Sequence, residues 1–154
     1  MSSVSENGVN LIKSFEGFRD KAYQDQASIW TIGYGTIKYP DGRKVEKGDE
    51  CTMQQATEWL TDHISKNAAP AVNQDVKQSL TQNQFDALVS FVYNEGEGNF
   101  KQSTLLKRVN ENPSNLEIAD AFMMWTKVTV NGHKVESAGL KNRRTAEADL
   151  YFTH

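Results

Sequence analysis

Hydrophobic residues recur at helical spacing near the start of the chain. Val9, Ile12 and Phe15 are three residues apart, and Leu11 lies beside them. This spacing places apolar side chains on one face of a helix. It predicts an N-terminal helix from about Glu6 to Phe18.

The pattern changes in the segment from Ala22 to Val45. This segment is rich in aromatic, β-branched and glycine residues, and Pro40-Asp41-Gly42 is a strong turn signal. Such a composition is typical of short strands joined by tight turns. We predict a small antiparallel sheet of two or three short strands here.

Helix-start signals follow this strand-rich segment. In a capping box, a Thr or Ser side chain and a Glu or Gln three residues later each satisfy a free backbone N–H. Three segments match this pattern, namely Thr52–Gln55, Thr81–Gln84 and Ser114–Glu117. Each match predicts the start of a helix.

Other residues predict where these helices end. Pro70 should break the helical pattern that begins at Met53, because proline lacks an N–H and clashes with the preceding turn. Gly96 and Gly98 should end the helix that starts near Thr81. The loop Val128–Ser137 contains Asn131-Gly132, which is typical of a hairpin turn, and a final helix is expected from Leu140 to Phe152.

These elements predict an α+β fold in one domain over residues 1–154. The β-rich lobe covers about residues 19–50, and the remainder is helical. A chain of 154 residues is long enough to bury a substantial core. Two lobes of different architecture favour a cleft between them, where ligand sites commonly form.

Composition excludes several classes of protein. The formal net charge is −3, which argues against a nucleic-acid-binding protein. No stretch approaches the ~20 apolar residues that span a bilayer, so no stable membrane insertion is expected. The N-terminal segment lacks the basic start and apolar run of a secretory signal, and we therefore expect folding in the cytoplasm.

Metal and thiol chemistry are also not indicated. Cys51 is the single cysteine, so an internal disulfide and a thiolate metal cluster are excluded. The three histidines show no metal-ligand spacing and belong to no recognisable catalytic motif. We expect neither a metal nor a cofactor, and interpret Cys51 as a small apolar residue before a helix.

Two carboxyl groups stand in contrasting surroundings. Glu16 lies at the end of the predicted N-terminal helix between Phe15 and Phe18, where a carboxyl group loses hydration. Asp25 follows nine residues later in the polar segment Tyr23–Gln26. Glycoside hydrolysis requires such a pair, one group to protonate the leaving oxygen and one to act on water. The alternative is that both are solvated surface carboxylates, like most of the 20 acidic residues.

The order of motifs resembles that of the phage-type lysozymes, or endolysins, a family of glycoside hydrolases. Phe15-Glu16-Gly17 is followed by Asp25 and by the run Trp30–Gly35. In that family a Glu, an Asp nine residues on and a Thr six residues further form the catalytic set, which here falls on Glu16, Asp25 and Thr31. The resemblance continues through segments 80–88, 93–96, 103–106 and 139–144, in family order.

The resemblance implies a lysozyme-like fold and a muramidase activity. Family members hydrolyse the β-1,4 bond between N-acetylmuramic acid and N-acetylglucosamine with inversion. Glu16 would protonate the glycosidic oxygen, while Asp25 and the Thr31 hydroxyl would hold the attacking water. An inverting site needs its carboxyl groups roughly 6.5–9.5 Å apart. Arg143 or Arg144 would pair with Glu16 in the resting protein.

Further roles follow from position in the matching motifs. Ile37, Tyr93 and Ser103 are the expected substrate-binding residues, although Tyr93 could equally belong to the core. Thr36 departs from the family, because many relatives carry His at this position. Trp30, Trp59 and Trp125 stand at periodic apolar positions, and we assign all three to packing.

The expected partner is peptidoglycan, and the chain is expected to be a monomer that reaches the cell wall through a holin or another export route to lyse the cell. One alternative is a non-catalytic module that binds peptidoglycan or a protein on a lysozyme fold. Another is a lytic transglycosylase, which needs the acid but no water-activating Asp. A role as an interbacterial toxin instead of a phage lysis enzyme also stays open.

Overall fold

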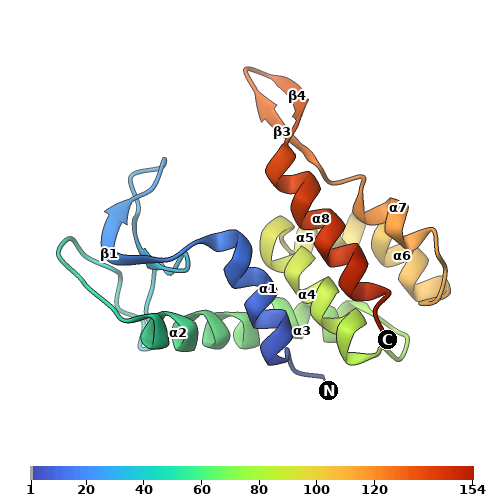
Figure 1. Ribbon diagram of the computed structural model, residues 1–154, viewed down its shortest axis with the longest axis horizontal. Helices are drawn as coiled ribbons and strands as arrows, with labels where there is room; N and C mark the ends of the chain where they lie inside the picture. The colour runs from blue at the N-terminus through green and yellow to red at the C-terminus, as the bar shows by residue number, and fades with distance from the viewer. Residues whose placement is uncertain (1) are drawn as a thin grey trace.

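The computed structural model describes residues 2–154 and shows a strand-rich segment followed by a mainly helical body (Figure 1). The two small sheets are both antiparallel and two-stranded. The predicted α+β class is confirmed. Within the described residues, no helix is long and apolar enough to cross a membrane.

Helix α1 spans Glu6–Glu16 and begins where predicted. The Ser5 side chain accepts a hydrogen bond from the Gly8 backbone N–H and caps the helix. The helix ends two residues before the predicted Phe18, because Gly17 adopts a φ of 70° that favours glycine. Val9 and Ile12 face the core.

Strand β1 (Arg19–Gln24) pairs with strand β2 (Trp30–Gly33). Tyr23 lies opposite Thr31, and the register shifts between Arg19 and Tyr23. The predicted turn near Pro40 is present, with the Gly42 N–H bonded to the Tyr39 carbonyl at 2.9 Å. The chain around this turn forms only isolated bridges, so the sheet has two strands and not three.

Helices α2 (Met53–Lys66) and α3 (Ala68–Asp75) replace the single long pattern that begins at Met53. The Thr52 capping box is present as predicted. The break falls at Asn67, three residues before Pro70, which places the proline in the first turn of α3. A first-turn N–H has no intrahelical partner, so proline is tolerated there.

Helix α4 (Gln82–Glu95) lies at the centre of the helical body and packs against α1, α3 and α8 (Figure 1). Its Thr81 capping box is confirmed, and every residue from 85 to 92 is buried. The helix ends at Gly96, which has a φ of 88°. Gly98 does not end this helix; it lies inside the next one, α5 (Glu97–Gln102).

Helices α6 (Thr104–Glu111) and α7 (Ile118–Phe122) close one side of the body. The predicted capping box at Ser114 is wrong. The Ser114 N–H is bonded to the Asn112 side chain, and the Glu117 N–H to that of Asn115. These asparagine turns satisfy the local donors, and α7 begins only after Glu117.

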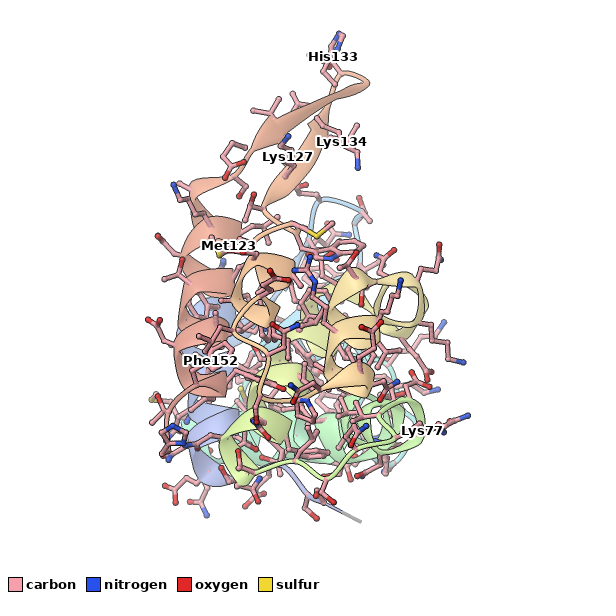
Figure 2. The ribbon with its side chains drawn as sticks, turned by 90° about the vertical axis from the view of Figure 1, so that its right-hand side faces the viewer. Lys77, Met123, Lys127, His133, Lys134 and Phe152 are labelled. Atoms are coloured by element: carbon pink, nitrogen blue, oxygen red, sulfur yellow. The ribbon has the colours of Figure 1, made fainter. Side chains whose placement is uncertain are left out.

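The second sheet is a hairpin of β3 (Lys127–Val130) and β4 (His133–Glu136). Its turn is Asn131-Gly132, as predicted, with φ values of 50° and 80°. All eight strand residues are exposed, and Figure 2 shows the hairpin projecting from the body with His133 at its tip. This hairpin lies in the part of the chain that was expected to be helical.

The last helix, α8, spans Ala138–Tyr151 and begins two residues before the predicted Leu140. The Ser137 side chain caps it by accepting from the Leu140 N–H. Its inner face buries Arg143, Arg144 and Glu147 along with Ala148 and Tyr151. Three charged residues on a buried face indicate a polar network inside the protein.

Candidate active site

Glu16 is the last residue of α1, and its side chain is 24% exposed. Its carboxylate accepts a hydrogen bond from Arg143 Nη1 at 2.7 Å, a contact between residues 127 positions apart. The predicted partnership between Glu16 and one of the two arginines therefore falls on Arg143. Because the Arg143 side chain is only 4% exposed, this ion pair joins α1 to the interior of the helical body.

Arg143 is itself held by Ser90 and Glu147. Its Nε donates to Glu147 Oε2 at 3.3 Å, and its Nη2 lies 3.4 Å from both the carbonyl and the hydroxyl oxygen of Ser90. The Ser90 hydroxyl donates to the same Glu147 oxygen at 2.6 Å. A planar guanidinium with donors engaged on three sides has little freedom to turn.

Arg144 completes this network on the far side of Glu147. Its Nε lies 2.9 Å from Glu147 Oε1, an ion pair that is not aligned as a hydrogen bond. Its Nη1 donates to Glu95 at 3.2 Å, and its Nη2 to the Asn94 side chain. Burial raises the pKa of Glu147 and lowers that of Arg144, while their mutual attraction opposes both changes. The charges thus alternate from Glu16 through Arg143, Glu147 and Arg144 to Glu95.

Asp25 and Thr31 form a second group in the strand-rich segment. Asp25 follows β1, and its Oδ1 accepts from the backbone N–H groups of Ala27 and Ile29 at 2.8 and 2.9 Å. The Thr31 hydroxyl donates to the Ile29 carbonyl at 2.9 Å. Asp25 and Thr31 are therefore both anchored to the main chain of Ile29. Asp25 Oδ2 makes no hydrogen bond in the described part of the chain, and Thr31 is 4% exposed.

Glu16 and Tyr93 both lie close to Gly35. A Cβ atom built on Gly35 would lie 3.6 Å from Glu16 Oε1 and 3.8 Å from the Tyr93 hydroxyl oxygen. The Tyr93 hydroxyl donates to the Tyr34 carbonyl at 3.5 Å. Burial and the neighbouring Glu16 carboxylate raise the pKa of Tyr93 to about 12, so it stays a hydrogen-bond donor at neutral pH.

A cavity of about 380 Å³ opens beside this point. Gly35, Ile37 and Tyr93 line it together with Thr36 and His63. Ile37 is 49% exposed and available to a ligand. Thr36 therefore shares this cavity with His63 from α2.

Ser103 is not among the residues that line this cavity. It is 5% exposed, its hydroxyl donates to the Phe100 carbonyl at 2.7 Å, and it accepts from the Leu106 N–H at 3.0 Å. Both bonds belong to the start of α6, where Ser103 is the N-cap. Its substrate-binding role stays a prediction from the motif. Trp59, which we assigned to packing, also lines the 380 Å³ cavity, so that assignment is incomplete.

The roles of Ser90, Glu95 and Glu147 in this network were not predicted from the sequence. Glu147 had a signal, because it stands four residues after Arg143 and three after Arg144, the spacings at which side chains on a helix meet. Ser90 had none, since its partners are more than fifty residues away. Across residues 2–154, no three His, Cys, Asp or Glu side chains gather as a metal site would require.

The comparison with known proteins decides the family. Residues 13–147 match the family model described as phage lysozyme, a span that includes Glu16, Asp25, Thr31 and Arg143. The chain belongs to the phage lysozyme family. It is therefore a peptidoglycan-hydrolysing muramidase, and the alternative of a non-catalytic module is not favoured.

Three relatives of this phage lysozyme illustrate the match. It is 42% identical over 148 residues to the endolysin of Acyrthosiphon pisum secondary endosymbiont phage 1, covering 96% of this chain and 97% of that protein. It is 43% identical to the endolysin of Bacillus phage PZA, covering 96% of this chain but 54% of that protein. The solved endolysin from Escherichia coli O157:H7 phage FAHEc1 is 46% identical, with a TM-score of 0.90 over 98% of this chain and 94% of that one.

Proposed function

We propose that Glu16 is the proton donor and that Asp25 and Thr31 position the water that attacks the opposite face of the sugar. The observation that carries this assignment is the pairing of Glu16 with the buried Arg143 beside the cavity that Gly35, Ile37 and Tyr93 line. A proton donor needs a fixed position, which Arg143 supplies through its hydrogen bond to the Glu16 carboxyl group. The same guanidinium then stabilises the carboxylate that remains after Glu16 has given its proton to the leaving oxygen.

The attacking water would be bound by acceptor atoms of Asp25 and Thr31 that still have hydrogen-bonding capacity. Asp25 uses Oδ1 for two backbone N–H groups, which leaves Oδ2 to accept a hydrogen bond from water. The Thr31 oxygen can accept from the same water while its O–H group donates to the Ile29 carbonyl. An inverting reaction then requires the Glu16 and Asp25 carboxyl groups to be separated by roughly 6.5–9.5 Å.

Ile37 and Tyr93 contact the sugar in this proposal. Tyr93 presents a ring and a protonated hydroxyl next to Glu16, and Ile37 presents an exposed apolar side chain to the same cavity. Such a ring can pack on a sugar face while the hydroxyl forms a hydrogen bond. Ser103 is kept as a substrate-binding residue only because its position matches the family motif.

The decisive experiment is the clearing of outer-membrane-permeabilised Gram-negative cells by the wild type and by Glu16→Gln. The substitution keeps the shape of the side chain and removes the transferable proton. We expect the wild type to clear the suspension and the folded variant to lose about 10²–10⁴-fold in rate. Equal clearing by both proteins would show that Glu16 is not the acid.

A second measurement tests the stereochemistry. The first product formed should carry the inverted anomeric configuration, which NMR detects before the anomers equilibrate. A retained configuration would assign Asp25 a nucleophilic role instead. An anhydro sugar in the mass spectrum of the products would identify a lytic transglycosylase, which needs no water-activating Asp25.

The cellular context is part of the proposal. We infer that the protein acts as a monomer, is made in the cytoplasm and reaches the wall through a holin or another export route to lyse the cell. Sedimentation measures the oligomeric state. Fractionation of producing cells that lack a holin and other export systems should leave the protein in the cytoplasm, and its appearance in the periplasm would contradict the route.

A further inference from the structure

Three cavities follow one another away from Glu16 along α2. The first, of about 380 Å³, contains Gly35 and Tyr93. The second, of about 260 Å³, shares Lys38, Trp59, His63 and Asn67 with the first. The third, of about 410 Å³, shares Tyr39, Pro40 and Trp59 with the second. Because each cavity shares lining residues with the next, the three adjoin one another, and we call the surface that they form the Trp59 groove.

Trp59 is the one side chain common to all three cavities. It is half-buried, and its ring meets the Tyr39 ring edge-on at a centroid distance of 4.8 Å. Trp125 differs, because it packs on the main core against Phe91 at 5.7 Å. A large aromatic side chain outside the core that borders a continuous groove is placed to meet a ligand.

The far end of the groove is lined by hydrogen-bonding groups around these two rings. Asp41, Arg43, Asp49, Glu50 and Gln55 surround the third cavity. The Tyr39 hydroxyl donates to Asp49 at 2.6 Å, and this bond, with the Glu46 N–H, lowers the pKa of Asp49. Arg43 is paired with Asp41 at 2.7 Å. Aromatic faces flanked by acceptors and paired charges suit a neutral, hydroxyl-rich ligand.

We propose that the Trp59 groove binds sugar units of the glycan strand beyond those held at Glu16, with Trp59 and Tyr39 as the aromatic surface. This inference rests on the proposed function, since it assigns the catalytic end of the groove to the bond that is cut. The glycan is a polymer, so a groove continuous with the catalytic cavity is occupied by the same strand. Trp59 therefore sets a preference for long strands over short ones.

The binding test uses Glu16→Gln, which cannot cleave the ligand, and oligomers of N-acetylglucosamine from two to six units. We expect the indole N–H resonance of Trp59, assigned by its absence in Trp59→Phe, to move only with the longer oligomers. The Trp125 resonance is the internal reference and should not move. Failure of every oligomer to move the Trp59 signal while signals of Ile37 or Tyr93 respond would overturn the proposal. So would an equal response to free stem peptide without sugar.

The kinetic test compares Trp59→Ala with Met53→Ala. Met53 lies on the same helix, is 57% exposed and lines none of the three cavities. Loss of one aromatic contact should raise KM for long glycan strands roughly tenfold and leave kcat unchanged. The KM for a tetrasaccharide should rise less than the KM for long strands, and Trp59→Phe should retain most of the affinity for long strands.

The two tests separate this inference from the proposed function. If Glu16→Gln still cleaves, the assignment of the acid fails, whereas the length dependence of KM in Trp59→Ala still reports on the groove. If Trp59→Ala and Trp59→Phe are folded and show wild-type KM on long strands, the groove proposal is wrong while the catalytic assignment stands.

Discussion

The two halves of the candidate site are built in opposite ways. The acid half consists of Glu16 and the buried network of Arg143, Glu147 and Ser90 in the helical body. The water half consists of Asp25 and Thr31, held by the main chain of a single turn at Ile29. Side chains from three helices fix the first, and backbone groups within seven residues fix the second.

Because of this difference, substitutions in the two halves should affect different properties, namely the stability of the fold and the rate of the reaction. A buried charge network must be complete, because removing one member leaves its partners uncompensated in a medium that disfavours charge. A turn held by backbone groups tolerates a change of side-chain charge if the acceptor oxygen is kept. Substitutions in the buried network behind Glu16 should therefore destabilise the protein, whereas those in the water half should inactivate it without destabilising it.

The largest effect is expected for Asp25→Asn. The amide oxygen can still accept from Ala27 and Ile29, but the residue can no longer take a proton from water. Activity should fall about 10²–10⁴-fold while the free energy of unfolding changes by less than ~0.5 kcal/mol. Clearing assays and urea denaturation measure the two quantities. A folded Asp25→Asn with wild-type rate would remove Asp25 from the mechanism.

Glu147→Gln should show the reverse behaviour. It leaves Arg143 and Arg144 facing each other without their shared carboxylate, at a cost of about 3–5 kcal/mol. We expect Tm to fall by roughly 10 °C in thermal denaturation. The matched control is Asp149→Asn, an exposed acidic residue on the same helix, which should leave Tm unchanged. An unchanged Tm in Glu147→Gln would mean that the network adds no stability.

Thr31→Val tests the weaker contact of the water half. Valine has nearly the shape of threonine, so the buried position stays filled and the loss is the hydroxyl group alone. Activity should fall roughly 10- to 100-fold if that hydroxyl contacts the reacting water. Thr31→Ser keeps the hydroxyl and should recover most of the rate. Similar rates for Val and Ser variants would contradict a role for the oxygen.

The smallest expected effect is the contribution of Tyr93 to stability at alkaline pH. Its folded-state pKa of about 12 lies above the ordinary value of 10.0, so the folded protein holds this proton more tightly than the unfolded chain. The resulting stability is fully present below pH 10 and is lost as pH rises through about 12. Tyr93→Phe should abolish this part of the pH dependence in denaturation experiments. A phenolate absorbance that titrates near 10 for Tyr93 would contradict its burial.

Local signals explain which elements could be predicted. The starts at Thr52 and Thr81 and the turn at Asn131-Gly132 depend on hydrogen bonds or dihedral angles within a few residues. Ser114 failed for the same local reason, because Asn112 and Asn115 compete for the donors that it was expected to satisfy. The break at Asn67 was displaced from Pro70 because proline fits a first turn as well as it ends a helix.

The residues of the candidate site also fall into those that the sequence predicts and those that depend on long-range packing. Spacing and family resemblance predict Glu16, Asp25 and Thr31 as the catalytic residues, and Arg143 was one of two candidates for the partner of Glu16. Choosing between Arg143 and Arg144 required the orientation of α8 against α1, which depends on core packing over the whole chain. Ser90 and the groove at Trp59 depend on the same long-range packing, so no pattern in the sequence revealed them.

The 127-residue separation between Glu16 and Arg143 also bears on timing during synthesis. A ribosome makes Glu16 early, but the guanidinium that fixes it emerges only with the last helix. Contacts between such distant positions form late in folding, because a long loop must close first. A nascent chain that still lacks α8 therefore has no guanidinium to hold the Glu16 carboxyl group in place.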